Sequence, residues 1–221
     1  MDHLPASEAL SAATHLVGAV AAAVAGVWLV RRGRDREQVV ALSIYVACAV
    51  AMLTASGLYH LAGEDHPQRA ALQRLDHAAI WLQIAGTFTP IHIVFFRGAW
   101  RWAPLVVVWT GAFLGIVLKL LFFGAIPEGP GLFLYLGLGW FGVLSVAQLV
   151  RERGFATIAP VFLGGVWYSS GALLELSRWP TLVEGVFGPH QLFHVAVLAG
   201  VLHHWSFIHR WAGADLHAQA S

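Results

Sequence analysis

Residues 188–211 read GPHQLFHVAVLAGVLHHWSFIHRW, a mostly apolar run that contains several histidines. About 20 predominantly apolar residues is the length that a bilayer-spanning helix needs. Pro189 suits the first turn of such a helix, where a missing N–H costs nothing. His190 and His194 stand four residues apart, so a helix places them on one face. Because that spacing lets two imidazoles bind one metal ion, the stretch predicts a membrane span and half of a metal site.

The composition of the whole chain is that of a membrane protein. Of its 221 residues, 58% are hydrophobic and 11% are charged, whereas a soluble domain carries about 25% charged residues. The net charge of +1 offers no case for binding nucleic acid. Cys48 is the only cysteine, which excludes an intramolecular disulfide. We interpret it as a small buried hydrophobic residue.

Seven apolar segments are each long enough to cross a bilayer as a helix. They cover residues 8–30, 39–61, 76–96, 102–123, 131–150, 155–177 and 189–211. The first is not expected to be a signal peptide, because acidic Asp2 and Glu8 stand where a positive region belongs. The sequence therefore predicts an all-α integral membrane protein, a seven-transmembrane helix bundle in which residues 1–221 form a single domain.

The ionisable residues within the spans gather on the membrane side where the chain begins. Such groups are costly inside a bilayer, so each raises a functional question. His60 ends the second span, Asp76 begins the third, and His190 and His194 begin the seventh, after six crossings. An even number of crossings returns the chain to its starting side. Three histidines and one carboxylate from three helices can therefore meet at one depth.

This set of side chains suits zinc. Catalytic zinc sites use three protein ligands and leave the fourth position to water, and zinc lowers the pKa of that water to about 7. With His60, His190 and His194 neutral, the Asp76 carboxylate and a hydroxide bring the formal charge of the site to zero. An isolated ion in an apolar interior costs on the order of 20 kcal/mol, which favours including Asp76. We predict one Zn²⁺ in this site.

Three nearby polar residues can belong to the site, and two of them also have a structural interpretation. Ser56, one turn deeper than His60, is either a hydrogen-bond partner within the site or a small packing residue. Glu8 and His15 can both line a polar cavity, but Glu8 can equally cap the first helix.

Two further polar residues are expected to have structural roles. Lys119 should extend its ammonium group to the interface on the same side. His77 faces roughly 100° away from Asp76 around the helix and is expected to pack against its neighbours.

The chain resembles the hemolysin III family, the bacterial branch of the progestin and adipoQ receptors. The resemblance covers nearly the whole chain in order. The segments that carry it are SGLYHL at 56–61, RLDHAAIWLQIAGTFTP at 74–90, GIVLKL at 115–120, LYLGLGW at 134–140, HQLFHVAVLAG at 190–200, and Glu8 with Thr14 and His15.

The resemblance implies a seven-helix bundle with zinc held by His60, His190 and His194. Asp76 would hold or orient the zinc-bound water, with Ser56 beside it. The motifs are also similar to those of alkaline ceramidases, which implies hydrolysis of a lipid amide. The hemolysin name implies membrane lysis, but no segment of the sequence predicts a pore.

Three functions follow from these observations. The first is an intramembrane zinc hydrolase, with Asp76 as general base and a membrane lipid amide or ester as a substrate that enters laterally. The second is a receptor-like or membrane-lipid-homeostasis protein whose zinc is structural. The third is a haem electron carrier, because the pairs His190/His204 and His77/His92 have the spacing of transmembrane bis-imidazole sites; it leaves the other predicted ligands without a role.

The loop arginines predict an orientation in the cell membrane. On the side where the chain begins, the short loops contain Arg69, Arg74 and Arg178. On the other side they contain Arg31, Arg32, Arg34, Arg36, Arg97, Arg101, Arg151, Arg153 and Arg210. Short loops rich in Lys and Arg stay in the cytoplasm, so the N-terminus and the zinc site are expected outside. The resemblance implies the reverse, since the receptor branch is taken to have both toward the cytoplasm.

Overall fold

The computed structural model describes residues 4–125 and 127–216, in which helices are connected by short turns and no β-strand is formed. The elements are α1 Ala6–Arg31, α2 Arg36–Leu61, α3 Arg69–Phe95, α4 Gly98–Leu121, the short 3₁₀ helix η1 Phe123–Ala125, α5 Glu128–Trp140, α6 Val143–Arg153, α7 Phe155–Ser177 and α8 Pro189–Trp211. Seven segments of the described chain are long and apolar enough to span a membrane, with α5 and α6 together forming one of them. The predicted seven-helix membrane bundle is confirmed.

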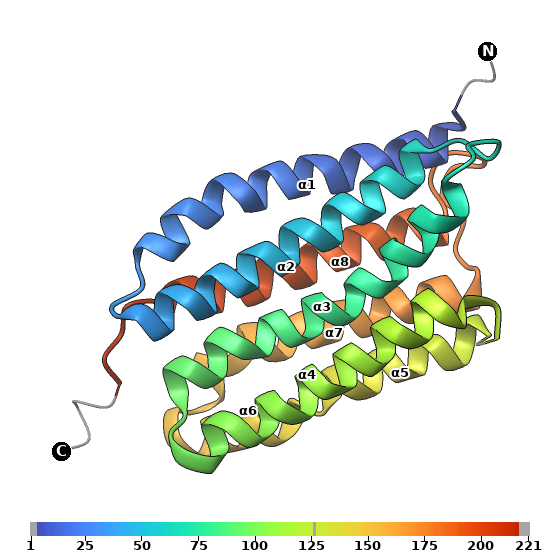
Figure 1. The fold of residues 1–221 in the computed structure, drawn as a ribbon. Coiled ribbons are helices and arrows are strands. Elements are labelled where there is room, and N and C mark those ends of the chain that lie inside the picture. The colour runs from blue at the N-terminus through green and yellow to red at the C-terminus, as the bar shows by residue number, and fades with distance from the viewer. Residues whose placement is uncertain (1–3, 126, 217–221) are drawn as a thin grey trace.

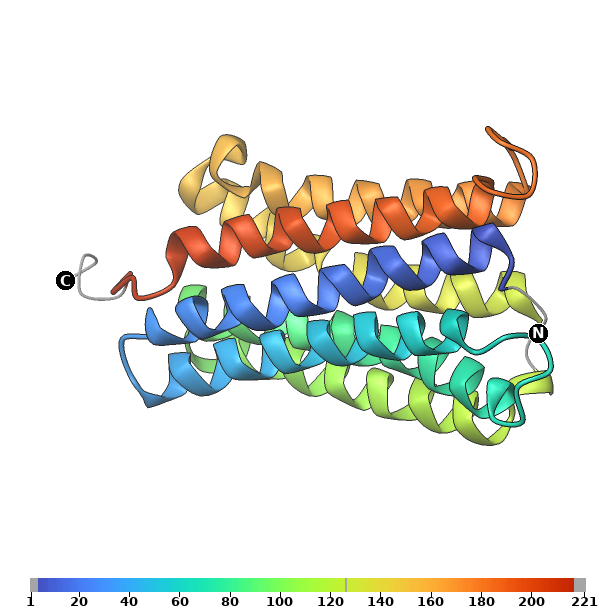
Figure 2. The same cartoon turned by 90° about the horizontal axis from the view of Figure 1, so that it is seen from above.

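The helices are packed as a bundle around α3. Figures 1 and 2 show α1, α2, α3 and α4 following one another, with α8 returning beside α1 and α7. α3 also contacts α5 and α8, and it is the most buried of the described spans. The two chain ends lie at opposite ends of the bundle, as seven crossings require (Figure 1). The α2–α3 and α7–α8 connections therefore lie at the N-terminal end.

Some helix ends differ from the prediction. α3 begins at Arg69, so Asp76 lies two turns inside the helix instead of at its start. α4 begins at Gly98, which places Pro104 inside that helix. The predicted fifth span is two helices, because the chain tightens between them: the Gly142 N–H donates to Gly139 O at 3.1 Å. A Cβ on Gly142 would lie 2.9 Å from Phe88 Cζ, so α3 approaches the break closely.

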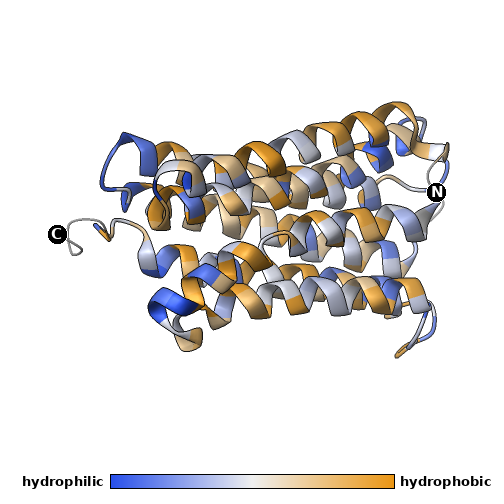
Figure 3. Ribbon diagram, turned by 90° about the horizontal axis from the view of Figure 1, so that it is seen from below, coloured by the Kyte–Doolittle hydropathy of each residue, from blue (hydrophilic) through white to orange (hydrophobic). Residues whose placement is uncertain are grey.

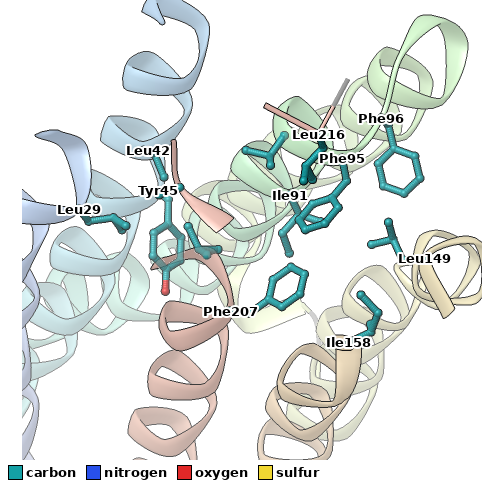
Figure 4. Packing of buried hydrophobic residues seen from close by; sticks show 13 residues of the cluster. Leu29, Leu42, Tyr45, Ile91, Phe95, Phe96, Leu149, Ile158, Phe207 and Leu216 are labelled. Atoms are coloured by element: carbon teal, nitrogen blue, oxygen red, sulfur yellow. The ribbon is translucent and has the colours of Figure 1, made fainter. Parts of the chain in front are cut away.

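The end of the bundle away from the N-terminus is packed with large apolar side chains. Figure 4 shows Phe95 of α3, Leu149 of α6, Ile158 of α7 and Phe207 of α8 meeting there. The Phe95 and Phe207 rings stack with their centroids 5.2 Å apart. In a membrane, lipid is as apolar as the core, so close packing stabilises this end more than removal from water does.

The outer surface is apolar along the helices and hydrophilic mainly toward the two ends (Figure 3). Large hydrophobic side chains are exposed on every span, among them Val17, Trp28, Val106, Phe113 and Leu202. A water-facing surface would not place so many there, whereas a lipid-facing surface favours them. The chain is a multi-pass membrane protein.

Candidate metal centre

The first turn of α8 is fixed against α1 by one glutamine. Gly188 precedes the helix and Pro189 begins it. The Gln191 Oε1 accepts a hydrogen bond from the Gly188 N–H at 2.9 Å. This bond satisfies one of the backbone N–H groups that have no partner within the helix at its start. Its Nε2 donates to Ser7 O at 3.3 Å and to Ser11 Oγ at 3.2 Å. These contacts set the rotation of α8 and therefore the direction in which His190 and His194 point.

Three imidazoles converge at the N-terminal end of the bundle. His60 comes from the last turn of α2, and His190 and His194 come from the start of α8. The His190 Nε2 lies 3.2 Å from His60 Nε2 and 3.1 Å from His194 Nε2. One ligand atom from each of the three lies within 4.8 Å of the others. His60 and His194 are buried, whereas the His190 side chain is 38% exposed.

Two carboxylates lie behind the imidazoles. The Glu8 Oε2 of α1 is hydrogen-bonded to His60 Nδ1 at 3.1 Å, and Glu175 Oε2 of α7 lies 3.3 Å from His190 Nδ1 without the geometry of a hydrogen bond. Glu8 also pairs with Arg69 at 3.2 Å. Pro5 occupies the N-cap position of α1 and no side chain caps that end, so Glu8 belongs to the polar site and the capping interpretation is wrong. Glu175 was not among the predicted site residues.

This arrangement of nitrogens can hold a metal ion. A carboxylate accepts a hydrogen bond from Nδ1–H, which leaves the lone pair of a neutral imidazole on Nε2. His60, whose Nδ1 is hydrogen-bonded to Glu8, therefore directs an Nε2 lone pair into the cluster, where a cation can accept it. With metal–nitrogen bonds of about 2.05 Å, a tetrahedral site separates its ligand nitrogens by about 3.3 Å. The two separations of 3.2 and 3.1 Å are close to that value.

Asp76 and Ser56 lie together beside the three histidines. Ser56 is buried in α2, one turn before His60. Its hydroxyl lies close to the Asp76 carboxyl, and the carboxyl is near enough to His190 to interact with its charge. Asp76 is not one of the closely grouped ligand atoms, which come from histidines alone. The structure therefore places Asp76 next to the ligand set and outside it.

A fourth histidine belongs to the same cluster. The His15 ring of α1 stacks on the His194 ring with centroids 3.8 Å apart and 18° between the planes. His15 is buried, and neither of its ring nitrogens has a hydrogen-bond partner in the described part of the chain. Sequence analysis placed His15 on the correct side of the membrane. Its ring contact depends on how α1 packs against α8.

Lys119 does not extend to the interface, and that prediction is wrong. Its side chain is buried within the bundle, where the ammonium lies 5.2 Å from the centroid of the Phe123 ring and 5.8 Å from that of Tyr135. Aromatic faces attract a cation at these distances. His77 packs edge-on against the same Phe123 ring at 5.1 Å, in keeping with the packing role expected for it.

The histidine pairs considered for haem are engaged elsewhere. The His92 Nδ1 donates to Trp100 O at 2.9 Å, and its Nε2 accepts from Ser145 Oγ at 3.1 Å. Pro104 has no N–H to offer Trp100 O four residues earlier, so His92 replaces the missing helix bond. His204 Nε2 donates to Val161 O at 3.2 Å. His92 has no nitrogen left for an iron, and these side chains do not fit a bis-imidazole haem site.

The sequence of the whole bundle matches one family. A family model described as "Haemolysin-III related" matches residues 5–205. The chain belongs to the haemolysin III family. It is 30% identical to Hemolysin-3 of Bacillus cereus over 204 residues, which cover 90% of this chain and 89% of that protein. It is 29% identical to the Hemolysin-3 homolog of Bacillus subtilis over 196 residues, 87% and 88% of the two chains.

The family match includes every residue of the histidine cluster described above. Residues 5–205 contain the three imidazoles, both carboxylates behind them, and the adjoining pair Asp76 and Ser56. The candidate metal centre of this haemolysin III protein therefore lies inside the part of the chain that defines the family.

Proposed function

We propose that this protein is a zinc-dependent hydrolase of a membrane lipid amide or ester. The observation that carries the proposal is the convergence of three imidazole Nε2 atoms beside one carboxylate, Asp76. Three neutral nitrogen donors suit zinc and leave a fourth position for water, which is the ligand count of catalytic zinc sites. A purely structural site more often has four protein ligands.

The residues around the cluster have distinct chemical tasks in this proposal. Zinc, when bound, supplies a water that is acidic enough to lose a proton near neutral pH. The Asp76 carboxylate accepts that proton, and the Ser56 hydroxyl holds the carboxylate in place. Glu8 keeps the proton of His60 on Nδ1, and Glu175 places a second carboxylate beside His190 Nδ1. Such carboxylate–histidine contacts fix ring orientation and raise the basicity of the ligand nitrogen.

A cavity offers space for part of the substrate chain. It has a volume of about 180 Å³ and is lined by residues of α2, α3, α5, α6, α7 and α8; a cavity of about 150 Å³ holds one benzene molecule. Phe193, which lines it, lies with its ring centroid 6.2 Å from His190 and 6.1 Å from His194. Trp140 and Phe162 line the cavity and are also exposed on the lipid-facing surface. A membrane lipid could thus enter laterally and place its head group near the histidines.

Asp76→Asn tests the assignment of the base. We expect the variant to keep most of its zinc, because the three histidines remain, and to lose lipid amide hydrolysis by at least about 100-fold, the range for removing a general base. Elemental analysis and product detection on purified protein would measure both. If the variant loses zinc as completely as His60→Ala, Asp76 is a ligand and its role as base is wrong.

A second candidate is a receptor-like or lipid-homeostasis protein with structural zinc. The observation that favours it is the burial of His60 and His194, each only 2% exposed, which limits access to the cluster. Removal of the metal separates the two candidates. A metal-free protein that keeps its helical bundle and loses hydrolysis supports the enzyme, whereas collapse of the bundle supports a structural role.

For the orientation, we propose that the N-terminus and the histidine cluster face outward across the cell membrane. The support is the distribution of arginines in the short loops, 3 at the histidine end against 9 at the other, since this bias sets topology. C-terminal fusions to one reporter active only inside and one active only outside would test it. Activity of the outside reporter would reverse the orientation.

A further inference from the structure

A second polar cluster lies deeper in the bundle, where α7 and α8 exchange aromatic rings. The His204 ring of α8 lies against Gly164 of α7, where an added Cβ would be 2.7 Å from the ring. The Tyr168 ring of α7 lies against Gly200 of α8, where an added Cβ would be 2.6 Å from it. The two ring centroids are 5.6 Å apart. Each helix thus holds the ring of the other in a fixed position.

The polar atoms of this cluster are not satisfied by the protein. Because His204 Nε2 donates to Val161 O, its Nδ1 carries a lone pair, and that atom has no partner in the described chain. The Tyr168 hydroxyl and Gln83 Oε1 of α3 likewise have no hydrogen-bond partner in the described chain. Tyr168 lies beside the Gln83 side chain, but without the geometry of a hydrogen bond. Gln83 is 3% exposed and His204 is 7% exposed, so water outside the bundle does not reach them.

All three side chains line the cavity of about 180 Å³. Its other walls are mostly apolar, among them Ile84, Phe88, Leu136, Val146 and Val197. Buried polar groups in native proteins usually have a partner, and wholly apolar cavities stay dry. An apolar chamber with a few convergent polar atoms is the usual form of a site for an amphipathic molecule.

We propose that Gln83, Tyr168 and His204 bind a hydroxyl group carried within the hydrocarbon chain of a lipid that occupies this cavity. Such a hydroxyl donates to Gln83 Oε1 or His204 Nδ1 and accepts from the Tyr168 O–H. An anion would meet two acceptors and a single donor, and a cation would meet no carboxylate among the three. A neutral hydroxyl fits the unpaired atoms best.

The proposed subsite is separate from the metal centre. His204 follows His194 by ten residues, which is about 15 Å along a helix. None of the three histidines of the metal centre lines the cavity, and Phe193 lies between them and it. A chain whose head group lay on the histidine side of Phe193 would present its middle to this cluster. The proposal concerns binding alone, so it holds whether or not the protein hydrolyses the lipid.

Equilibrium binding of two fatty acids of equal length, one with a mid-chain hydroxyl and one without, tests the proposal on the full-length purified protein. We expect the wild type to bind the hydroxylated acid about tenfold more tightly, since one or two hydrogen bonds are gained. Tyr168→Phe keeps the ring against Gly200, and Gln83→Leu keeps the approximate side-chain size. Each should reduce the preference to about twofold or less and leave binding of the plain acid unchanged.

The matched control is Tyr45→Phe, which removes a buried hydroxyl that contacts Val201 O at 3.4 Å and does not line the cavity. It should retain the full preference. Equal binding of the two acids by the wild type, or a preference that survives in both cavity variants, would overturn the proposal. So would a structure with ordered water alone at the three side chains and no binding of either acid. Because no turnover is measured, failure here leaves the hydrolase proposal intact.

Discussion

The two halves of α8 are both rich in histidine, yet they use it differently. In the first half, His190 and His194 meet a third imidazole from α2 with nitrogens 3.1–3.2 Å apart. In the second half, His203 contacts the carbonyl of Ala199 in its own helix at 2.8 Å, and His204 contacts Val161 O. Residue type and helical spacing are therefore insufficient to create a metal site. A third donor and the carboxylates behind the rings make the difference.

The surroundings of each half explain the contrast. The start of α8 lies where α1, α2 and α7 contribute Glu8, His60 and Glu175. The end of α8 lies within the large apolar cluster that includes Phe95 and Phe207 (Figure 4). The start of the helix thus faces donors that can share a cation, and its last turns face mainly apolar side chains.

The largest effect is expected from removing a histidine in the first half. His194→Ala should reduce zinc from one ion per chain by at least tenfold, because two imidazoles and a water bind zinc far less well than three imidazoles. His203→Ala is the matched control in the second half and should keep the metal. Elemental analysis of both purified proteins measures the effect.

Metal at the wild-type level in both variants would contradict this ligand set. Loss of metal from both to the same extent would mean that the metal depends on the integrity of α8 as a whole. The comparison between the halves would then have no basis in chemistry.

A smaller effect is expected from placing a larger side chain where α7 packs against the second half of α8. Gly164→Val places a side chain against the His204 ring, where a Cβ already comes within 2.7 Å. Such overpacking costs about 1–3 kcal/mol, so the thermal unfolding midpoint in detergent should fall. Gly139→Ala is the control, since a Cβ there meets nothing within 4 Å, and its midpoint should be unchanged or higher. If Gly164→Val unfolds at the same temperature as the wild type, α7 can move away from α8 to make room for the side chain.

Sequence reasoning succeeded for features that depend only on the order of residues along the chain. Apolar length predicts the seven spans, and the number of crossings predicts that His60, His190 and His194 lie at one end. It failed for side chains whose position depends on residues that the fold brings next to them. Lys119 is buried because the Phe123 and Tyr135 rings accept its cation, and neither contact is visible in the sequence.

The carboxylate behind His190 was missed for a related reason. Glu175 lies near the end of the predicted span 155–177, and nothing in the sequence shows which helix it faces. Its place beside His190 depends on how α7 packs against α8. The break between α5 and α6 likewise depends on how closely Phe88 approaches Gly142. The family resemblance, in contrast, was confirmed by the match over residues 5–205.

The smallest effect concerns the cap that holds α2 beside the end of α8. The Asp35 carboxylate accepts a hydrogen bond from the Gln38 N–H at 2.9 Å. The Gln38 side chain in turn accepts from Gly213 N–H at 3.0 Å and donates to Ala214 O at 3.2 Å, just beyond α8. The chain just beyond this end of α8 is therefore anchored by the Gln38 side chain, whereas the other end is fixed against α1 by the Gln191 side chain.

The Asp35 cap should weaken in acid. The Gln38 N–H holds the pKa of the Asp35 carboxyl below its ordinary value of 3.8, so the folded protein binds this proton less readily than the unfolded chain. The stabilisation is present above that ordinary value and is lost as the pH falls through the lower folded pKa.

We expect Asp35→Ala to lower the free energy of unfolding by about 1 kcal/mol at neutral pH, and this difference from wild type to shrink below about pH 4. Asp35→Asn caps without titrating, so its advantage over Asp35→Ala should persist in acid when unfolding of the three detergent-purified proteins is compared. If the wild type keeps its full stability advantage over Asp35→Ala at a pH well below the folded pKa, the charge on Asp35 does not contribute. The hydrogen bond from the uncharged side chain alone would then hold this end of the bundle.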